Sequence, residues 1–224
     1  MEILDVFANL ALLYEKYGYK LYLVGGSVRD YLLKMPTSDM DLCSDATPEQ
    51  TKEFLPEANY RFAKYGTVSF HYDIFRVEVT TLRTEGQYVD FRHPREITFV
   101  KSPELDYKRR DFTVNALYLD RDMKVFDFDS GLADLKTKTL KMIGDPLQRI
   151  EEDPLRIIRA LRFKLKLGFD FDENLDKAIH KKIKLLDHLN PEKRDFEIKK
   201  MFKIDEEKAM QLLKTYNISY KQPN

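Results

Sequence analysis

The chain changes its hydrophobic pattern near Pro146, and this change constrains the fold more than any other feature of the sequence. Before it, short apolar runs of strand length alternate with turns, and only the opening stretch up to Gly18 and a few short segments have helical spacing. After it, apolar residues recur at helical spacing through three long segments. The sequence therefore predicts an α+β front part followed by an all-helical rear part.

The same periodicity predicts individual elements in each part. A buried strand over residues 20–24 ends at Gly25-Gly26, and we expect Ser27 to cap a short helix through Leu33. Residues 84–108 show no clear period, which predicts a long loop. Further strands are expected at 38–43, 67–72, 74–81 and 125–128, and further helices at 47–56, 150–165, 175–189 and 195–216.

Composition excludes several classes of protein. The 38 basic and 38 acidic residues give zero net charge, which excludes an indiscriminate coat for nucleic acid. The single cysteine, Cys43, excludes an intrachain disulfide framework and a zinc site built from cysteines, and we expect it to be a buried packing residue. No apolar run reaches the roughly 20 residues of a membrane span, and the first residues lack a basic leader. These features predict a cytoplasmic protein without a membrane partner.

Asp39 and Asp41 flank one residue of a predicted strand. Side chains two apart on a strand point the same way, so both carboxylates can converge on one hard cation or bridge two. The alternative is a surface turn, which accounts for most Asp-x-Asp sequences. The preceding Gly25-Gly26-Ser27 favours the metal site, because glycines at a strand-to-helix turn let backbone N–H groups approach phosphates. Together these residues indicate a site that holds a nucleoside triphosphate through metal ions.

Three further clusters are candidates for the same site. Strand alternation places Glu78 either beside the two aspartates or on a solvated strand face. The segment 109–115 is dense in groups that hydrogen-bond phosphate and sugar hydroxyls. The third cluster consists of four residues spaced three apart, Asp153, Arg156, Arg159 and Arg162. This spacing predicts that their side chains lie on one side of a helix, where they would either form surface ion pairs or face a pocket and read a base edge.

Five segments occur in an order typical of one enzyme family. They are LVGGSVRD at 23–30 with SDMD at 38–41, RRDFTVNAL at 109–117, residues 127–135 with 144–146, residues 152–163, and residues 189–202. This series resembles the motifs of class II tRNA nucleotidyltransferases, which comprise CCA-adding enzymes, their CC- and A-adding relatives and bacterial poly(A) polymerases. The last segment differs from the family pattern, with Asn190 and Lys193 where Ser and Arg are usual.

The resemblance implies a domain layout. Residues 1–143 would form a polymerase-β-like nucleotidyltransferase head, a mixed β-sheet flanked by helices, and residues 144–224 an all-helical neck that selects the nucleotide. Family members continue into helical body and tail domains that grip the tRNA. The chain ends about twenty residues after the last motif, so we expect the body and tail domains to be absent.

The resemblance also implies roles for individual residues. Asp39 and Asp41 would bind two Mg²⁺ ions. Glu78, which strand alternation and not the resemblance suggests, is the candidate for a further catalytic carboxylate. Asp153 and Arg156 would pair with the incoming base, so that protein serves as the template. The remaining nucleotide-binding candidates are Gly25, Gly26, Ser27, Arg29 and Asp30 along the triphosphate, Arg110, Asp111 and Asn115 at phosphate and ribose, and Arg159 and Arg162 on the nucleotide-selecting helix.

We therefore expect a template-independent nucleotidyltransferase that adds C and A residues to the 3′ end of tRNA from CTP and ATP, with Mg²⁺. Residues 82–88 and 91–95 resemble the flexible loop of CCA- and A-adding enzymes. An A-adding or poly(A)-type transferase acting on RNA 3′ ends is the alternative within enzymes. A non-catalytic RNA-binding module is the alternative outside them, and the intact acidic and basic candidates argue against it.

Overall fold

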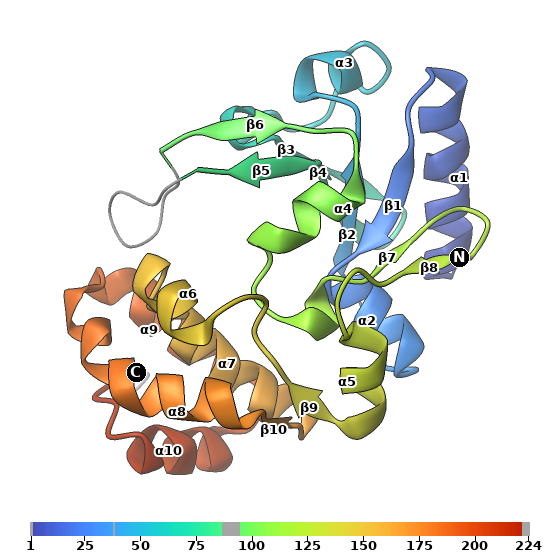
Figure 1. The fold of residues 1–224 in the computed structure, drawn as a ribbon. Helices are drawn as coiled ribbons and strands as arrows, with labels where there is room; N and C mark the ends of the chain where they lie inside the picture. Colours follow the sequence, from blue (N-terminus) through green and yellow to red (C-terminus); the bar gives the residue numbers. More distant parts are fainter. Residues whose placement is uncertain (1, 38, 87–94, 221–224) are drawn as a thin grey trace. The chain divides into compact units, whose positions relative to one another are not determined.

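The computed structural model describes residues 2–37, 39–86 and 95–220, and the chain divides into two compact units (Figure 1). Unit 1 comprises residues 2–86 and 96–132, and unit 2 comprises residue 95 and residues 133–220. The division falls between residues 132 and 133, before the boundary expected after residue 143. The resemblance to a flexible loop falls partly on residues 87–94, which lie outside the described residues.

Unit 1 is built on a six-stranded mixed sheet with the strand order β3-β4-β2-β1-β7-β8. Strands β2 and β4 pair in parallel, and every other neighbouring pair in this sheet is antiparallel. This is the mixed sheet that the sequence predicts. Its strands are β1 (Leu21–Val24), β2 (Asp39–Ser44), β3 (Thr67–Tyr72), β4 (Phe75–Thr81), β7 (Tyr118–Leu119) and β8 (Val125–Phe126).

Short helices and a second strand pair surround this sheet (Figure 1). The strand pair joins β5 (Arg83–Glu85) to β6 (Ile97–Phe99) in antiparallel register. The helices of unit 1 are α1 (Ile3–Lys16), α2 (Gly26–Leu32), α3 (Pro48–Lys52) and α4 (Pro103–Asp106), with 3₁₀ turns at Ala63–Tyr65, Tyr107–Arg109 and Thr113–Asn115. Helix α5 (Gly131–Thr137) runs from unit 1 into unit 2.

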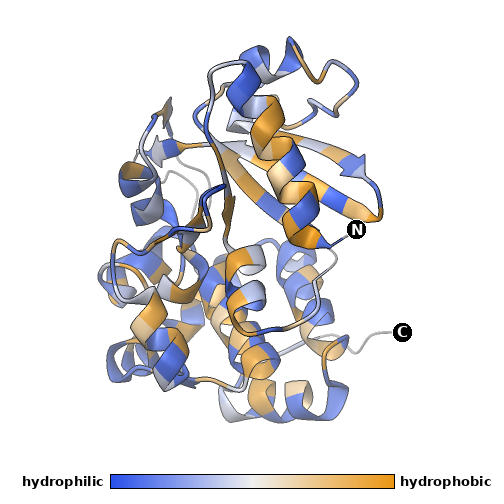
Figure 2. Ribbon diagram, turned by 90° about the vertical axis from the view of Figure 1, so that its right-hand side faces the viewer, coloured by the Kyte–Doolittle hydropathy of each residue, from blue (hydrophilic) through white to orange (hydrophobic). Residues whose placement is uncertain are grey.

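The core of unit 1 forms where α1 and the central strands bury their apolar side chains. Helix α1 buries Val6, Phe7 and Leu10 along one stripe, and Figure 2 shows hydrophobic and hydrophilic residues alternating along this helix beside the N-terminus. On β2, Met40 and Leu42 are buried. Because side chains alternate along a strand, the odd-numbered residues at the start of β2 face away from this core.

Two predicted elements differ from the structure of unit 1. Gly25, rather than Ser27, is the N-cap of α2, because its positive φ of 66° lets the chain turn directly into the helix. The expected loop over 84–108 contains β6, α4 and a 3₁₀ turn. Periodicity missed them because each is only three or four residues long.

Unit 2 is mainly helical. Its single strand pair in the described chain joins β9 (Thr139–Leu140) to β10 (Asp170–Phe171) in parallel. The helices are α6 (Pro146–Glu152), α7 (Leu155–Leu167), α8 (Glu173–Lys182), α9 (Pro191–Phe202) and α10 (Glu206–Thr215), with a 3₁₀ segment at Ile183–His188. The continuous helix expected from residue 150 is interrupted at Asp153-Pro154, because the residue before a proline disfavours the helical conformation.

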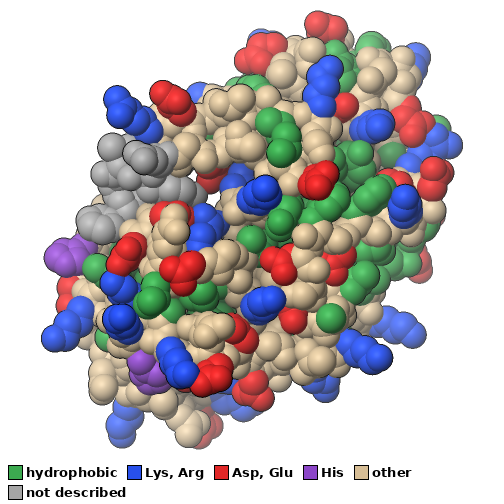
Figure 3. Space-filling model, viewed as in Figure 1, with side chains coloured by type: hydrophobic (Ala, Val, Ile, Leu, Met, Phe, Trp, Pro, Cys, Tyr) green, Lys and Arg blue, Asp and Glu red, His purple; other side chains and the backbone are tan. Residues whose placement is uncertain are grey.

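The surface agrees with the balanced composition. On the face shown in Figure 3, basic and acidic side chains are interspersed. None of the helices in the described residues is both long and apolar enough to cross a membrane. Cys43 is fully buried, as predicted, and burial raises the pKa of its thiol.

Candidate active site

Three carboxylates lie together on the sheet of unit 1. Asp39 and Asp41 occupy the face of β2 opposite Met40, and Asp41 is half-buried while Asp39 is exposed. In the parallel register of β2 with β4, Glu78 is the direct partner of Asp41. Glu78 therefore stands beside the two aspartates, where one of its two predicted positions placed it.

Burial and neighbouring charges both act on the pKa of Asp41. Burial raises it, and the neighbouring charge of Glu78 raises it further, whereas Arg110 lowers it. Burial and acidic neighbours disfavour the ionised form of this carboxylate, so a cation bound beside it would stabilise that form. Among the described residues, no group of three or more His, Cys, Asp or Glu is placed to hold a metal ion.

The glycine turn packs directly against the carboxylates. A Cβ added at Gly25 would lie 3.6 Å from Oδ2 of Asp41 and 3.8 Å from Nη1 of Arg110, and one at Gly26 would lie 3.5 Å from the same Asp41 oxygen. The positive φ of Gly25 also disfavours any other residue there. The turn thus brings backbone, a carboxylate and a guanidinium group within a few ångströms of one another.

Ser27 fastens this turn to the acidic strand. Its hydroxyl donates a hydrogen bond of 3.1 Å to the carbonyl of Asp39 and accepts one of 2.8 Å from the N–H of Asp41. Ser27 is 1% exposed. In this structure the side chain therefore fixes where β2 begins relative to α2, which sets the positions of both aspartates.

Four more predicted residues form one buried network beside the turn. Arg29 pairs with Asp30 at 2.6 Å and donates through Nη1 to the amide oxygen of Asn115. The amide nitrogen of Asn115 donates in turn to Oδ1 of Asp111 at 3.2 Å. All four side chains are buried. The network therefore ties the first and second motifs together below the glycine turn.

Arg110 is held by two residues that the sequence reasoning missed. Its guanidinium forms an ion pair of 2.9 Å with Asp106 and a hydrogen bond of 2.8 Å to the hydroxyl of Tyr118. Asp106 also pairs with Arg109. An acidic residue three and four positions before two arginines is a helical ion-pair signal, and that spacing was the only indication in the sequence.

In unit 2, Asp153 and Arg156 do not lie on one helix, so that part of the prediction is wrong. Asp153 follows α6 in extended conformation, and its carboxylate accepts from the N–H of Leu155 at 3.0 Å. Arg156 lies in the first turn of α7, is 4% exposed and donates to the carbonyl of Arg149 and the carboxylate of Glu152. The proline between them separates the two residues into different elements.

Arg159 and Arg162 do lie on α7, as predicted. Their guanidinium groups stand over the ring of Phe163, at 5.8 and 4.4 Å from its centroid. Arg162 also donates to the buried carboxylate of Glu197 on α9 at 3.0 Å. The position of Arg162 thus depends on α9, which belongs to the last of the five sequence motifs.

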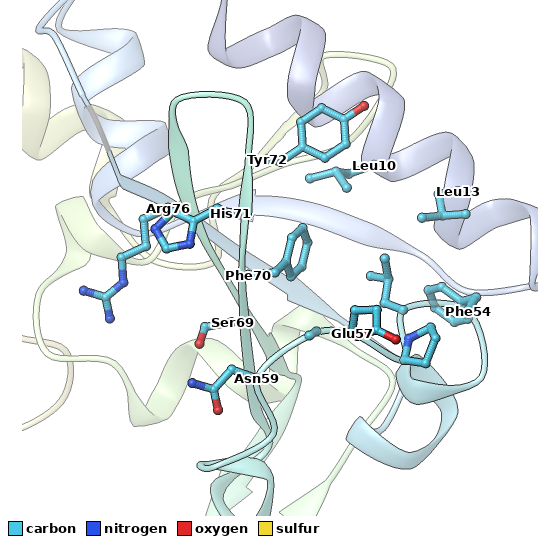
Figure 4. A pocket seen from close by; sticks show the side chains of 13 residues that line it. Leu10, Leu13, Phe54, Glu57, Asn59, Ser69, Phe70, His71, Tyr72 and Arg76 are labelled. Carbon is cyan, nitrogen blue, oxygen red and sulfur yellow. The ribbon is translucent and has the colours of Figure 1, made fainter.

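Two pockets open near the sheet of unit 1. One of about 350 Å³ is lined by Glu78 together with Arg61, Arg76 and Arg83, so it adjoins the carboxylate cluster. The other, of about 620 Å³, lies between α1, residues 54–59 and β3, with Leu10, Phe70 and Tyr72 among its lining (Figure 4). None of the three clustered carboxylates lines this second pocket.

Known proteins match both the sequence and the fold. The family described as poly A polymerase head domain matches residues 21–141. A CCA-adding enzyme of Listeria monocytogenes is 43% identical over 186 residues, which are 83% of this chain and 47% of that protein. A CCA-adding enzyme of Streptococcus mutans is 41% identical over 83% of this chain and 46% of its own length. The chain thus spans about half the length of these curated relatives.

Solved structures give the same relationship. The Bacillus stearothermophilus CCA-adding enzyme in complex with CTP has a TM-score of 0.85 and 32% identity, over 95% of this chain and 52% of that one. A tRNA nucleotidyltransferase complexed with a primer tRNA and an incoming ATP analog has a TM-score of 0.73 and 28% identity, over 94% of this chain and 60% of that one. The chain therefore belongs to the family that carries the poly A polymerase head domain, with CCA-adding enzymes among its relatives.

Proposed function

We propose that the chain catalyses nucleotidyl transfer from CTP and ATP to the 3′ hydroxyl of tRNA, adding C and A residues without a nucleic-acid template. The observation that carries the proposal is the register of Asp41 with Glu78, beside Asp39 and against the Gly25 turn. The relatives named CCA-adding enzymes, and the related structure with CTP, support the same reaction. A tRNA substrate would place the reaction in the cytoplasm.

Asp39 and Asp41 would hold Mg²⁺. The residues fit this ion, because Mg²⁺ is commonly bound by one or two carboxylates together with substrate phosphates and water rather than by an all-protein cage. The bound ions would neutralise charge on the phosphates and activate the attacking hydroxyl. The chain itself supplies two same-facing carboxylates on β2, with Glu78 as a further acceptor on β4.

The glycine turn and Arg110 would bind the triphosphate. Gly25 and Gly26 have no side chain to keep phosphate oxygens from the backbone, and Arg110 reaches the same turn. Asp111 and Asn115 would face the ribose, held in place by Arg29 and its partner Asp30. Ser27 would contribute indirectly, because its hydrogen bonds to the backbone of Asp39 and Asp41 fix the start of β2.

The domain assignment is part of the proposal. Residues 1–143 would be the catalytic head and residues 144–224 the neck that selects the nucleotide. Asp153 would accept from the exocyclic amino group of C or A, and Arg156 would donate to a ring nitrogen or carbonyl of the same base. Arg159 and Arg162 would shape the pocket through Phe163.

The reaction is tested by incubating the chain with Mg²⁺, one labelled nucleoside triphosphate at a time, and a tRNA lacking its terminal CCA. CCA addition requires incorporation of CTP, followed by ATP once both C residues are present. Incorporation of ATP alone would show an A-adding or poly(A)-type transferase. Binding of the tRNA without incorporation of any nucleotide would show a binding module and overturn the proposal.

Nucleotide choice tests the neck separately. Asp153→Asn keeps an oxygen that can accept from the N–H of Leu155, but it adds a donor toward the base. We expect discrimination against UTP and GTP to fall by about one to two decades, since each unpaired polar group costs about 1–3 kcal/mol. Arg159→Ala is the control and should lower rates without altering the choice. An equal decrease for all four nucleotides in Asp153→Asn would remove Asp153 from base selection.

A further inference from the structure

We infer that Asp106 and Tyr118 are positioning residues that hold Arg110 in the orientation needed to bind the triphosphate. The inference rests on the proposed function of Arg110, and neither residue is among the candidates that the motifs supplied. It assigns a specific task to Asp106, which forms an ion pair with Arg110. Both residues would act only by orienting Arg110, so neither needs to contact the substrate.

The contacts around Arg110 form a closed triangle. Oδ2 of Asp106 accepts from Nε of Arg110 at 3.0 Å and pairs with Nη2 at 2.9 Å. The hydroxyl of Tyr118 donates to the same Oδ2 at 2.7 Å and accepts from Nε of Arg110 at 2.8 Å. The edge of the planar guanidinium formed by Nε and Nη2 is thereby held by a carboxylate and a phenol that also hold each other.

The remaining terminal nitrogen is the one that reaches the proposed phosphate site. Nη1 of Arg110 lies 3.8 Å from where a Cβ of Gly25 would be. The guanidinium carbon lies 5.0 Å from the centroid of the Tyr118 ring, so the same tyrosine supports the plane of the group from one side. Orientation of Nη1 toward the glycine turn thus depends on Asp106 and Tyr118 together.

The arrangement is buried, yet its carboxylate keeps its charge. Asp106 is 0% exposed and Tyr118 is 0% exposed. Burial alone would raise the pKa of Asp106, but Arg110, Arg109 and hydrogen bonds from the Arg83 N–H and Tyr118 hold that pKa below its usual value. The carboxylate therefore stays ionised, and removing it would leave buried positive charge without its partner.

The same carboxylate extends the network to β5. Oδ1 of Asp106 accepts from the backbone N–H of Arg83 at 2.9 Å and from Nε of Arg109 at 2.8 Å. Arg83 in turn pairs with Glu85 at 2.7 Å. The three arginines and two acids of this network sum to one positive charge, which suits a site that must attract a triphosphate.

The test compares Tyr118→Phe with Thr81→Val. Tyr118→Phe removes the hydroxyl but keeps the ring beneath Arg110. Thr81→Val is the matched control, because it removes another buried hydroxyl of unit 1, one that donates a hydrogen bond of 2.8 Å to the carbonyl of Ala46. Steady-state kinetics measure KM for ATP, KM for the tRNA and kcat for each protein.

We expect Tyr118→Phe to raise KM for ATP and CTP about tenfold, because losing one hydrogen bond to a charged group lowers nucleotide affinity by about that factor. KM for tRNA and kcat at saturating nucleotide should change less than about twofold. Thr81→Val should leave all three constants near those of the wild type. In an Arg110→Ala background, Tyr118→Phe should have no further effect on KM for ATP, since the tyrosine acts through that arginine.

The outcomes separate this inference from the proposed function. If Arg110→Ala itself leaves KM for ATP unchanged, Arg110 does not bind the triphosphate and both fail. If Arg110→Ala raises KM while Tyr118→Phe behaves like Thr81→Val, or lowers kcat alone, only the positioning role is overturned. Should Tyr118→Phe fail to fold by circular dichroism, Asp106→Asn carries the same measurements. Failure of both to fold would show a purely structural role and overturn the inference.

Discussion

Asp41 and Asp106 are the same residue type in the same unit, yet their surroundings shift the pKa in opposite directions. Burial and the nearby Glu78 raise the pKa of Asp41, whereas two arginines, a tyrosine and a backbone N–H hold the pKa of Asp106 low despite its burial. The positive charge around Asp41 does not offset its burial and its acidic neighbour, whereas the arginines around Asp106 do offset its burial. The comparison teaches that only the first is suited to take up a cation, while the second is suited to hold protein groups in place.

The largest expected effect is on catalysis by the acidic strand. Asp39→Asn or Asp41→Asn should lower nucleotide addition about a thousandfold or more, because the lost charge is worth several kcal/mol at the reacting phosphate. Stability should not fall, since a charge that repels Glu78 has been removed. Single-turnover incorporation and thermal unfolding without added metal measure both. Activity within about tenfold of the wild type would remove the metal assignment.

Asp106 should show the reverse pattern in stability. Asp106→Ala leaves Arg109 and Arg110 beside a cavity without their acceptor, so we expect a loss of about 3 kcal/mol in the free energy of unfolding. Urea denaturation followed by circular dichroism gives the value. Asp41→Ala is the matched comparison in the same unit. Equal stabilities of the two variants would contradict the contrast drawn between the two aspartates.

Substitution of Glu78 should have an intermediate effect on the rate of nucleotide addition. It shares the register of Asp41 but lies on another strand, so we expect Glu78→Gln to slow addition about tenfold to a hundredfold. The requirement for Mg²⁺ should rise at the same time, as a titration of rate against metal concentration will show. Arg76→Gln, which removes the ion-pair partner of Glu78 on the same strand, is the control. A wild-type metal titration in Glu78→Gln would exclude Glu78 from the site.

The smallest effect concerns pH. The folded-state pKa of Asp106 is lowered, so its contribution to stability is present above the unfolded pKa and is lost as pH falls below that value toward the folded pKa. Unfolding free energies measured from neutral to acidic pH should therefore decline on the acidic side. The decline should be shallower in Asp106→Asn, which has no proton to bind there. Parallel curves for the two proteins would mean that Asp106 does not contribute.

Local alternation predicted β1, β2, β3, β4 and β8, and the shared face of Asp39 and Asp41, but it missed the short strands β5, β6, β7, β9 and β10. For Glu78 the sequence left two predicted positions open, one beside the two aspartates and one on a solvated strand face. Its place beside Asp41 depends on which strands are neighbours and whether they run parallel, and local alternation does not determine either. The break between α6 and α7 was missed because the apolar spacing continues across Pro154. The network at Asp106 was not predictable, because Tyr118 and Arg83 reach it from segments 12 and 23 residues away.

Asp153 shows the same limit in unit 2. A spacing of three residues predicted one shared helix face with Arg156, yet the proline between them puts Asp153 before the helix. The carboxylate then accepts from the Leu155 N–H, as capping residues do. A rule applied to spacing alone therefore fails where a single residue changes the backbone path.

The parallel pairing of β2 with β4 also has a consequence for how the chain folds. Asp41 and Glu78 meet only after the intervening residues close into a crossover, and long-range pairing of this kind forms slowly. Their like charges oppose the pairing, whereas Met40 with Val77 and Leu42 with Val79 are neighbours on the buried side and favour it. Hydrophobic contacts on one side of the sheet must thus assemble the acidic side against its own repulsion. We therefore expect these two strands to join late during folding, and divalent cations to speed that step.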